Sequence, residues 1–119
     1  MKKFKIIEKV LDTHCEFVIG SDAKARKYLL SEYQADLDEC SRGFHHYEYD
    51  VKKDMFRRCI WLEKFDVKEP EDMNVLVHEV THLVDRAFND KGIDESVDNT
   101  EVRAGYMGYW VREFLIKMK

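Results

Sequence analysis

The chain contains one proline, Pro70, and the spacing of its apolar residues changes there. Before Pro70, four short runs rich in aromatic and β-branched residues have the pattern of β-strands: residues 3–10, 15–19, 44–51 and 55–65. The polar residues 52–54 join the last two runs, which indicates a hairpin. After Pro70 the apolar residues recur at the spacing of a helix. We therefore expect most strands to precede the long helices.

Three segments have helical spacing. The first begins at Ser21-Asp22, two residues that favour the N-cap position, and ends before Gly43. The second spans residues 71–89, and its apolar side chains fall within an arc of about 140°. The third begins near Asp98 or Asn99 and continues to residue 119. The expected fold is a small α+β domain with a three- to four-stranded sheet, one helix between strands and two long helices after the sheet.

Length and composition indicate one globular domain over residues 1–119, because 45% of the residues are hydrophobic. No stretch approaches the ~18 consecutive apolar residues of a membrane-spanning helix, and the charged N-terminal residues do not resemble a secretion signal. The formal charge of −4 argues against a nucleic-acid partner. The three cysteines have no metal-type spacing and are expected to be reduced thiols in a cytoplasm.

The polar side of the second helical segment carries the pattern H-E-x-x-H, as His78-Glu79-Val80-Thr81-His82. Histidines four residues apart project from one helix face, where both imidazoles can bind one tetrahedral zinc ion. Glu79 follows His78 by one residue, so its side chain is rotated by one helical position away from the two histidines. It can reach a water molecule on the metal without binding the metal itself. The alternative interpretation is a solvated polar helix face.

Glu101, in the first turn of the last helix, is the candidate third zinc ligand. It shares a stripe of that helix with Ala104, Gly105 and Gly108. Glycine costs roughly 0.5–1 kcal/mol inside a helix, so two glycines suggest that another backbone comes close. If that backbone belongs to the H-E-x-x-H helix, the packing brings Glu101 towards the histidines. The alternative is that Glu101 only favours the helix N-terminus through the helix dipole.

The order His78, Glu79, His82, Glu101 resembles the gluzincin branch of the zincin metallopeptidases, in a minimal form like small zincin-like proteins of bacteria and their phages. The resemblance covers about a third of the chain. It implies that His78, His82 and Glu101 hold Zn²⁺ together with a water molecule, and that Glu79 activates this water to hydrolyse a peptide or protein substrate. It also implies an edge strand beside the cleft, expected at residues 58–64, along which an extended peptide could bind.

Gluzincins usually add a tyrosine or histidine that stabilises the oxyanion, for which the candidates here are Tyr106, Tyr109, His45 and His46. Each tyrosine fits equally well as a core or surface residue. His45 and His46 alternate across a strand, so at most one of them faces the cleft.

Two departures from the gluzincin pattern matter. Gly105 stands where many gluzincins carry an aspartate that supports a ligand, and Asp85 or Asp98 could take that role instead. The chain also has no second subdomain to deepen the cleft. The sequence therefore leaves two functions open: a zinc-dependent metallopeptidase, or a non-catalytic zinc-binding protein that serves as a structural or interaction module. The oligomeric state is also open.

Overall fold

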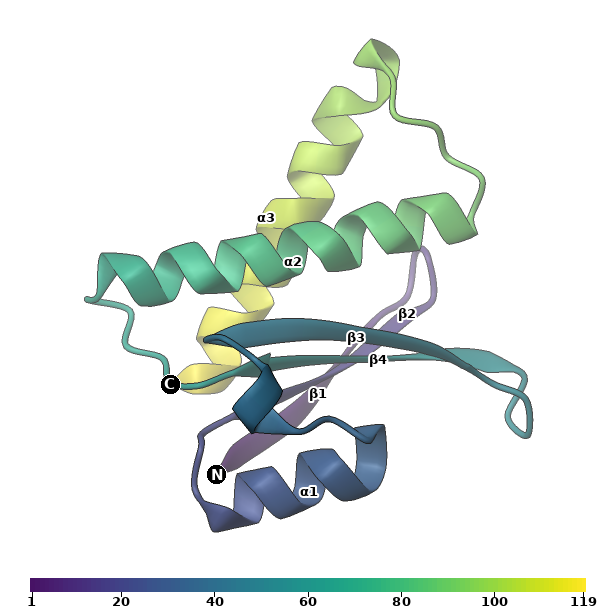
Figure 1. Cartoon of the computed structure of the whole chain (residues 1–119). Coiled ribbons are helices and arrows are strands. Elements are labelled where there is room, and N and C mark those ends of the chain that lie inside the picture. Colours follow the sequence, from purple (N-terminus) through teal and green to yellow (C-terminus); the bar gives the residue numbers. More distant parts are fainter.

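A four-stranded mixed sheet lies at the centre of the computed structural model, which describes residues 1–119 (Figure 1). Its strands are β1 (Lys2–Glu8), β2 (Thr13–Ile19), β3 (Gly43–Asp50) and β4 (Met55–Leu62), in the spatial order β1-β2-β4-β3. The neighbours β1 and β2 are antiparallel, as are β3 and β4, whereas β2 and β4 run parallel. The expected α+β class is confirmed, as is the hairpin of β3 and β4.

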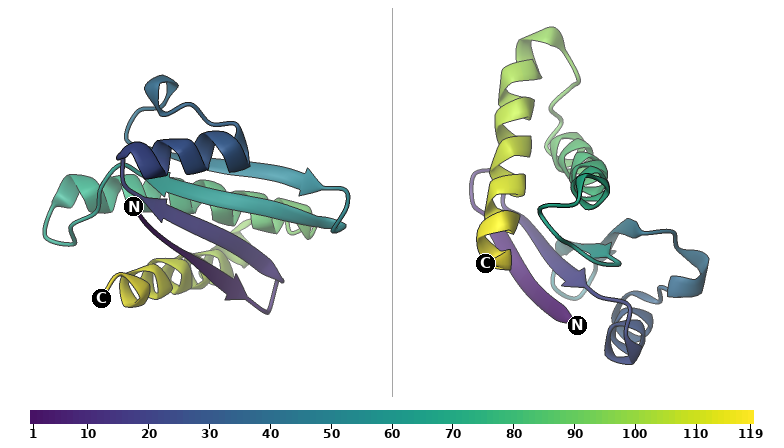
Figure 2. Two further views of the ribbon diagram at one scale, coloured as in Figure 1. Left: turned by 90° about the horizontal axis from the view of Figure 1, so that it is seen from below. Right: turned by 90° about the vertical axis from the view of Figure 1, so that its left-hand side faces the viewer.

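Helices cover both faces of the sheet (Figure 2). Helix α1 (Ala23–Tyr33) lies on one face, and the long helices α2 (Pro70–Asp90) and α3 (Thr100–Met118) lie on the other. Two short 3₁₀ turns, η1 (Leu37–Glu39) and η2 (Val97–Asn99), complete the elements. No helix has both the length and the apolar character needed to cross a membrane.

The first helix is shorter than predicted. It begins as expected, because the Asp22 side chain accepts a hydrogen bond from the backbone N–H of Ala25 at 2.8 Å. It ends at Tyr33, where Gln34 adopts a left-handed conformation with φ 56°. Leu37, which was expected to continue the helix, is buried in η1 instead. A left-handed residue stops the helical hydrogen bonds, and the helical spacing of Leu37 does not reveal this stop.

The edge strand beside α2 is β3, and the prediction of an edge strand at residues 58–64 is wrong. Strand β4 is internal because it pairs with β2 on one side and β3 on the other. Its residues Cys59, Ile60, Trp61 and Leu62 are at most 2% exposed. The chain returns from β2 through α1 to β3 before β4, and the parallel pairing of β4 with β2 then leaves β3 at the edge.

Helix α2 packs closely against the sheet at Gly43, the first residue of β3. A Cβ atom on Gly43 would lie 2.8 Å from Val75 Cγ1, 3.0 Å from the Trp61 carbonyl oxygen and 3.4 Å from Glu79 Cγ. Only a residue without a side chain leaves room for the helix at this point. The contact places one turn of α2 directly over the start of the edge strand.

The inference that Gly105 and Gly108 mark a close helix–helix contact is wrong. A Cβ atom on either glycine would have nothing within 4 Å, so both glycines face open space. The α2-facing side of α3 is instead formed by larger residues such as Met107, whose sulfur lies 4.0 Å from the Thr81 hydroxyl. The close backbone approach that glycine permits occurs between α2 and β3, on the other side of α2.

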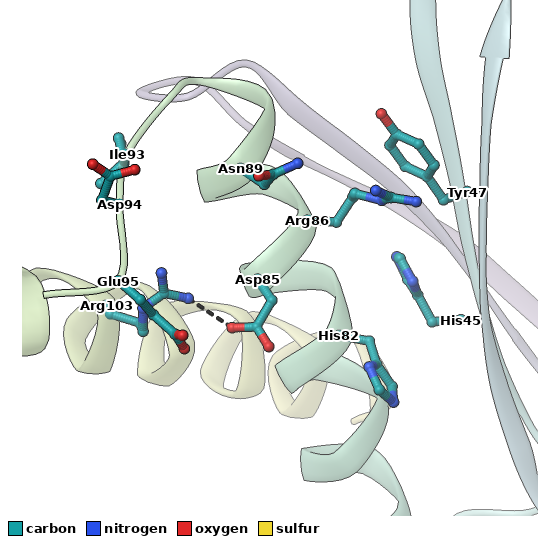
Figure 3. Close-up of a pocket in the computed structure, with 10 residues that line it drawn as sticks. All are labelled: His45, Tyr47, His82, Asp85, Arg86, Asn89, Ile93, Asp94, Glu95 and Arg103. Atoms are coloured by element: carbon teal, nitrogen blue, oxygen red, sulfur yellow. Dashed lines mark hydrogen bonds and ion pairs between the residues drawn. The ribbon is translucent and has the colours of Figure 1, made fainter.

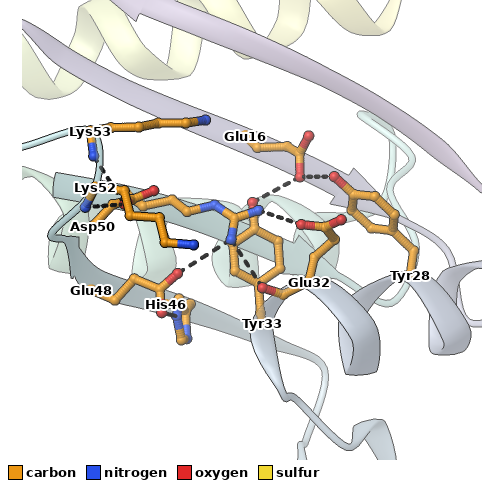
Figure 4. A network of polar contacts seen from close by, with 10 residues as sticks. Glu16, Tyr28, Glu32, Tyr33, His46, Glu48, Asp50, Lys52 and Lys53 are labelled. Atoms are coloured by element: carbon orange, nitrogen blue, oxygen red, sulfur yellow. Dashed lines mark hydrogen bonds and ion pairs between the residues drawn. The ribbon is translucent and has the colours of Figure 1, made fainter. Parts of the chain in front are cut away.

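A polar network attaches α1 to the sheet (Figure 4). The hydroxyls of Tyr28 and Tyr33 both donate to Glu16 Oε1, at 2.6 and 2.8 Å. Burial raises the pKa of both phenols, so they stay protonated donors. The Arg57 guanidinium carbon lies 4.3 Å from the centroid of the Tyr33 ring, and Arg57 pairs with the Glu32 carboxylate at 2.8 Å. The polar groups of this network are paired with one another, which indicates a structural role for the α1 face of the sheet.

Candidate metal centre

Helix α2 brings three potential metal-binding side chains together: His78, Glu79 and His82. One ligand atom from each lies within 4.8 Å of the others. The two histidines are exposed, and their Nε2 atoms are 3.2 Å apart with the rings at 85° to one another. The helix alone produces this arrangement, because residues four apart stand one above the other on the same face.

The spacing of the two nitrogens fits a tetrahedral metal ion. Zinc binds imidazole nitrogen at about 2.0–2.1 Å, and in a tetrahedron this bond length separates two ligands by about 3.3–3.4 Å. The observed separation of 3.2 Å is close to that value. Without a metal the same distance suits an N–H···N hydrogen bond, in which one imidazole donates and the other accepts. The donor set and its geometry therefore fit zinc.

Glu79 lies beside the histidines but points towards the sheet. It is 5% exposed, and its Cγ sits over the start of β3 at Gly43. Burial raises the pKa of the Glu79 carboxyl, and the nearby His78 and His82 partly oppose this rise. No hydrogen bond from another residue holds the carboxylate. A desolvated carboxylate with a raised pKa next to a pair of metal-type ligands has the properties of a general base.

A cavity of about 760 Å³ opens beside His82 (Figure 3). Strand β3 forms one wall, α2 forms the floor, and the loop after α2 and the first turns of α3 form the other wall. Its lining is mostly polar and charged: His45, Tyr47, His82, Asp85, Arg86, Asn89, Ile93, Asp94, Glu95 and Arg103. An open polar groove therefore lies between the edge strand and α3, and His82 is the residue of the candidate metal site that lines it.

His45 faces this groove, and its neighbour His46 faces the opposite side of the sheet. The centroid of the His46 ring there lies 5.1 Å from that of the Tyr33 ring. The prediction that at most one of the two histidines faces the cleft is confirmed. Burial is the largest cause that lowers the pKa of His45 to about 4, and the positive charge of Arg58 adds to it. His45 is therefore a neutral imidazole at physiological pH. Its Nε2 atom is buried and has no hydrogen-bond partner.

Two arginine pairs hold α2 to its neighbours. Arg103 of α3 donates to Asp85 Oδ1 at 2.6 Å, which ties the two helices together across the groove. Asp85 is thus engaged by a guanidinium and does not support an imidazole. At the end of α2, Asp90 accepts hydrogen bonds from both Arg58 and the Tyr47 hydroxyl, which fastens the helix to β4 and β3.

Glu101 does not join the histidine pair in this structure. Its side chain is exposed in the first turn of α3. At 100° per residue it lies about 160° around the helix from Arg103, one of the α3 residues that contact α2. The stripe that carries Glu101 is the open one with Gly105 and Gly108. Its role as a zinc ligand stays a prediction from the sequence resemblance.

The two candidate tyrosines also lie elsewhere. The Tyr106 hydroxyl donates to Glu8 Oε2 at 2.6 Å, and its ring packs against Phe88. Tyr109 lines the same apolar groove as Tyr106, beside the end of β1. Neither lines the groove that contains His82. Their helical positions did not reveal this, because the direction of the α3 faces depends on how the helix packs.

Comparisons with protein-family models, with curated proteins and with solved structures find no match for this chain. The case for the site therefore rests on the residues and their geometry. His45 is the residue that sequence reasoning undervalued. Strand alternation was the signal for it, but the choice between His45 and His46 required the pairing of β3 with β4.

Proposed function

We propose that this chain binds one zinc ion through His78 and His82 and hydrolyses peptide bonds with Glu79 as the general base. The observation that carries this proposal is the pair of Nε2 atoms 3.2 Å apart beside a buried carboxylate. The resemblance of the H-E-x-x-H pattern to gluzincins supports it. Burying the Glu79 carboxylate costs free energy, and a polar helix face without a function would not require that cost.

A zinc ion held at these imidazoles would polarise the scissile carbonyl and make a water molecule more acidic. Glu79 then accepts the proton of the attacking water and delivers it to the leaving amine. The Glu79 side chain packs against Gly43, so it lies beside the start of the edge strand. The raised pKa of Glu79 favours both roles, since a stronger base accepts the proton more readily at neutral pH.

The substrate class that suits the groove is an extended peptide or an unfolded protein segment. Strand β3 is an edge strand, so one side of its backbone has no strand partner. A peptide that adds to this edge by backbone hydrogen bonds lies next to the groove and the histidines. The three free cysteines agree with a reducing compartment, and we place the protein in the cytoplasm on that basis.

The second candidate function is zinc binding without catalysis, in a structural or interaction role. The exposed position of Glu101 favours it, because it leaves the site without the third ligand that the resemblance implies. A two-histidine site binds zinc more weakly than a three-ligand site and holds a reactive water less firmly.

The deciding experiment combines zinc content with hydrolysis of a mixture of unstructured peptides, followed by mass spectrometry. We expect about one zinc per chain, lost in His82→Ala. Glu79→Gln should keep the zinc and lose hydrolysis, whereas Glu95→Gln, which changes a glutamate that lines the groove beside His82, should keep both. Zinc without hydrolysis in the wild type would select the second candidate. No zinc uptake, even with zinc added, would refute both.

A further inference from the structure

We propose that His45 is the third protein ligand of the metal site and reaches it from the edge strand β3. This inference rests on the proposed zinc site at His78 and His82. In this arrangement His45, from the sheet, takes the place of Glu101, the third ligand predicted on the last helix.

The position of His45 on the sheet is the first argument. In the pairing of β3 with β4, His45 stands opposite Ile60. Ile60 belongs to the core cluster formed by the sheet, α2 and α3, so the His45 side chain is on the α2 face. Figure 3 shows it projecting from β3 into the groove beside His82. His45 and His82 therefore border the same open space, and His78 lies next to His82.

The unsatisfied ring nitrogen of His45 is the second argument. Nε2 is buried and has no hydrogen-bond partner. Buried polar atoms in native proteins are almost always satisfied, and a bound ion is one of the ways this happens. His46 Nε2 is also buried without a hydrogen bond, but the Glu48 carboxylate lies 3.3 Å away on its own strand. No carboxylate pairs with His45.

The other candidates near the pair are engaged or face away. Asp85, three residues after His82, holds Arg103 at 2.6 Å. Glu101 lies on the exposed stripe of α3, about 160° around the helix from Arg103. Glu79 is required as the base.

The ligand atoms within 4.8 Å of one another comprise only His78, Glu79 and His82. The His45 ring must therefore turn towards α2 to complete the site. Such a turn is a change of side-chain rotamer and leaves β3 in place. It would convert the unsatisfied nitrogen into a ligand and give a set of three histidines with one position left for water, as in catalytic zinc sites.

The direct test counts the metal-bound imidazoles in the zinc-loaded protein. The chain has five histidines, so long-range ¹H–¹⁵N correlation spectra of the side chains can resolve each ring. We expect three rings, those of His45, His78 and His82, to change to the metal-bound form when zinc is added. Changes in His78 and His82 alone would overturn the proposal for His45 and leave the zinc site intact. No change in any ring would refute the zinc site itself.

Variants give an independent readout through zinc affinity, measured by competition with a chelating dye. We expect His45→Gln to weaken zinc binding by about 100-fold or more, since it removes a ligand rather than an outer partner. His46→Gln is the matched control on the same strand and should bind as the wild type does. Glu101→Gln should also bind normally. Tight binding in His45→Gln together with loss in Glu101→Gln would overturn the proposal. If His45→Gln fails to fold, the count of bound rings in the wild type decides.

Discussion

Gly43→Ala tests how tightly α2 is packed on the edge strand. The added methyl group would lie 2.8 Å from Val75 Cγ1 and 3.0 Å from the Trp61 carbonyl oxygen. Favourable contacts between carbon atoms are about 3.5–4.0 Å, so Val75 must move by about 0.7 Å or more. The carbonyl of Trp61 belongs to the central strand β4 and cannot move without the sheet. The helix turn over β3 must therefore shift.

The expected cost follows from these contacts. Overpacking of this kind destabilises by about 1–3 kcal/mol. Alanine also has fewer conformations than glycine in the unfolded chain. This difference stabilises the folded protein by about 0.4–1 kcal/mol where the backbone conformation is compatible. Gly43 does not have a positive φ, so this smaller gain applies. The net expectation is a loss of about 1–2 kcal/mol in the free energy of unfolding.

Urea denaturation followed by tryptophan fluorescence measures this loss. With an m-value of about 1–3 kcal/mol/M, the midpoint should fall by about 0.3–2 M while the slope stays the same. Gly105→Ala is the matched control, because its new methyl group meets nothing within 4 Å. That change should stabilise the helix by about 0.5–1 kcal/mol. A Gly43→Ala protein as stable as the wild type would refute the packing described for α2 and β3.

Two further predictions concern buried polar pairs, both measured by urea denaturation. Tyr106→Phe removes the hydrogen bond to the Glu8 carboxylate and should lower the free energy of unfolding by about 1.5–3 kcal/mol. Zinc affinity and hydrolysis should stay unchanged. Loss of hydrolysis with zinc retained would instead support the catalytic role predicted from the sequence. Asp90→Ala leaves the charge of Arg58 without a partner, although its side chain is only 4% exposed, and should lower the free energy of unfolding by about 3–5 kcal/mol. A loss below about 1 kcal/mol would show that the pair contributes little to stability.

The long helices were predictable because their apolar residues follow the helical period over many turns. In α2 the predicted arc corresponds to the buried residues, with Leu76, Val80 and Leu83 completely buried. Two residues of the predicted arc are not buried: Met73 is partly buried, and Val77, at the margin of the arc, is 39% exposed. The H-E-x-x-H pattern could be placed on the polar side of this helix for the same reason.

The strand order and the third ligand were not predictable in this way. Local patterns identify strands, but the parallel pairing of β2 with β4 joins residues more than forty positions apart, such as Glu16 and Cys59. The glycine stripe of α3 showed which residues share a face with Glu101, but not where that face points. The loop between α2 and α3 determines this direction, and it contains no periodic signal. The choice of His45 over His46 likewise depended on the pairing of β3.

The two halves of α3 are held to the protein very differently. Trp110 and Phe114 are fully buried in its second half, whereas most residues from Glu101 to Gly105 are exposed. The first turns are attached to α2 mainly through the ion pair of Arg103 with Asp85, which is screened by salt. Their amide hydrogens should therefore exchange with solvent faster than those of the second half. Because this ion pair holds the α3 wall of the groove to α2, we expect the groove to widen as the ionic strength rises, while the β3 wall stays in place.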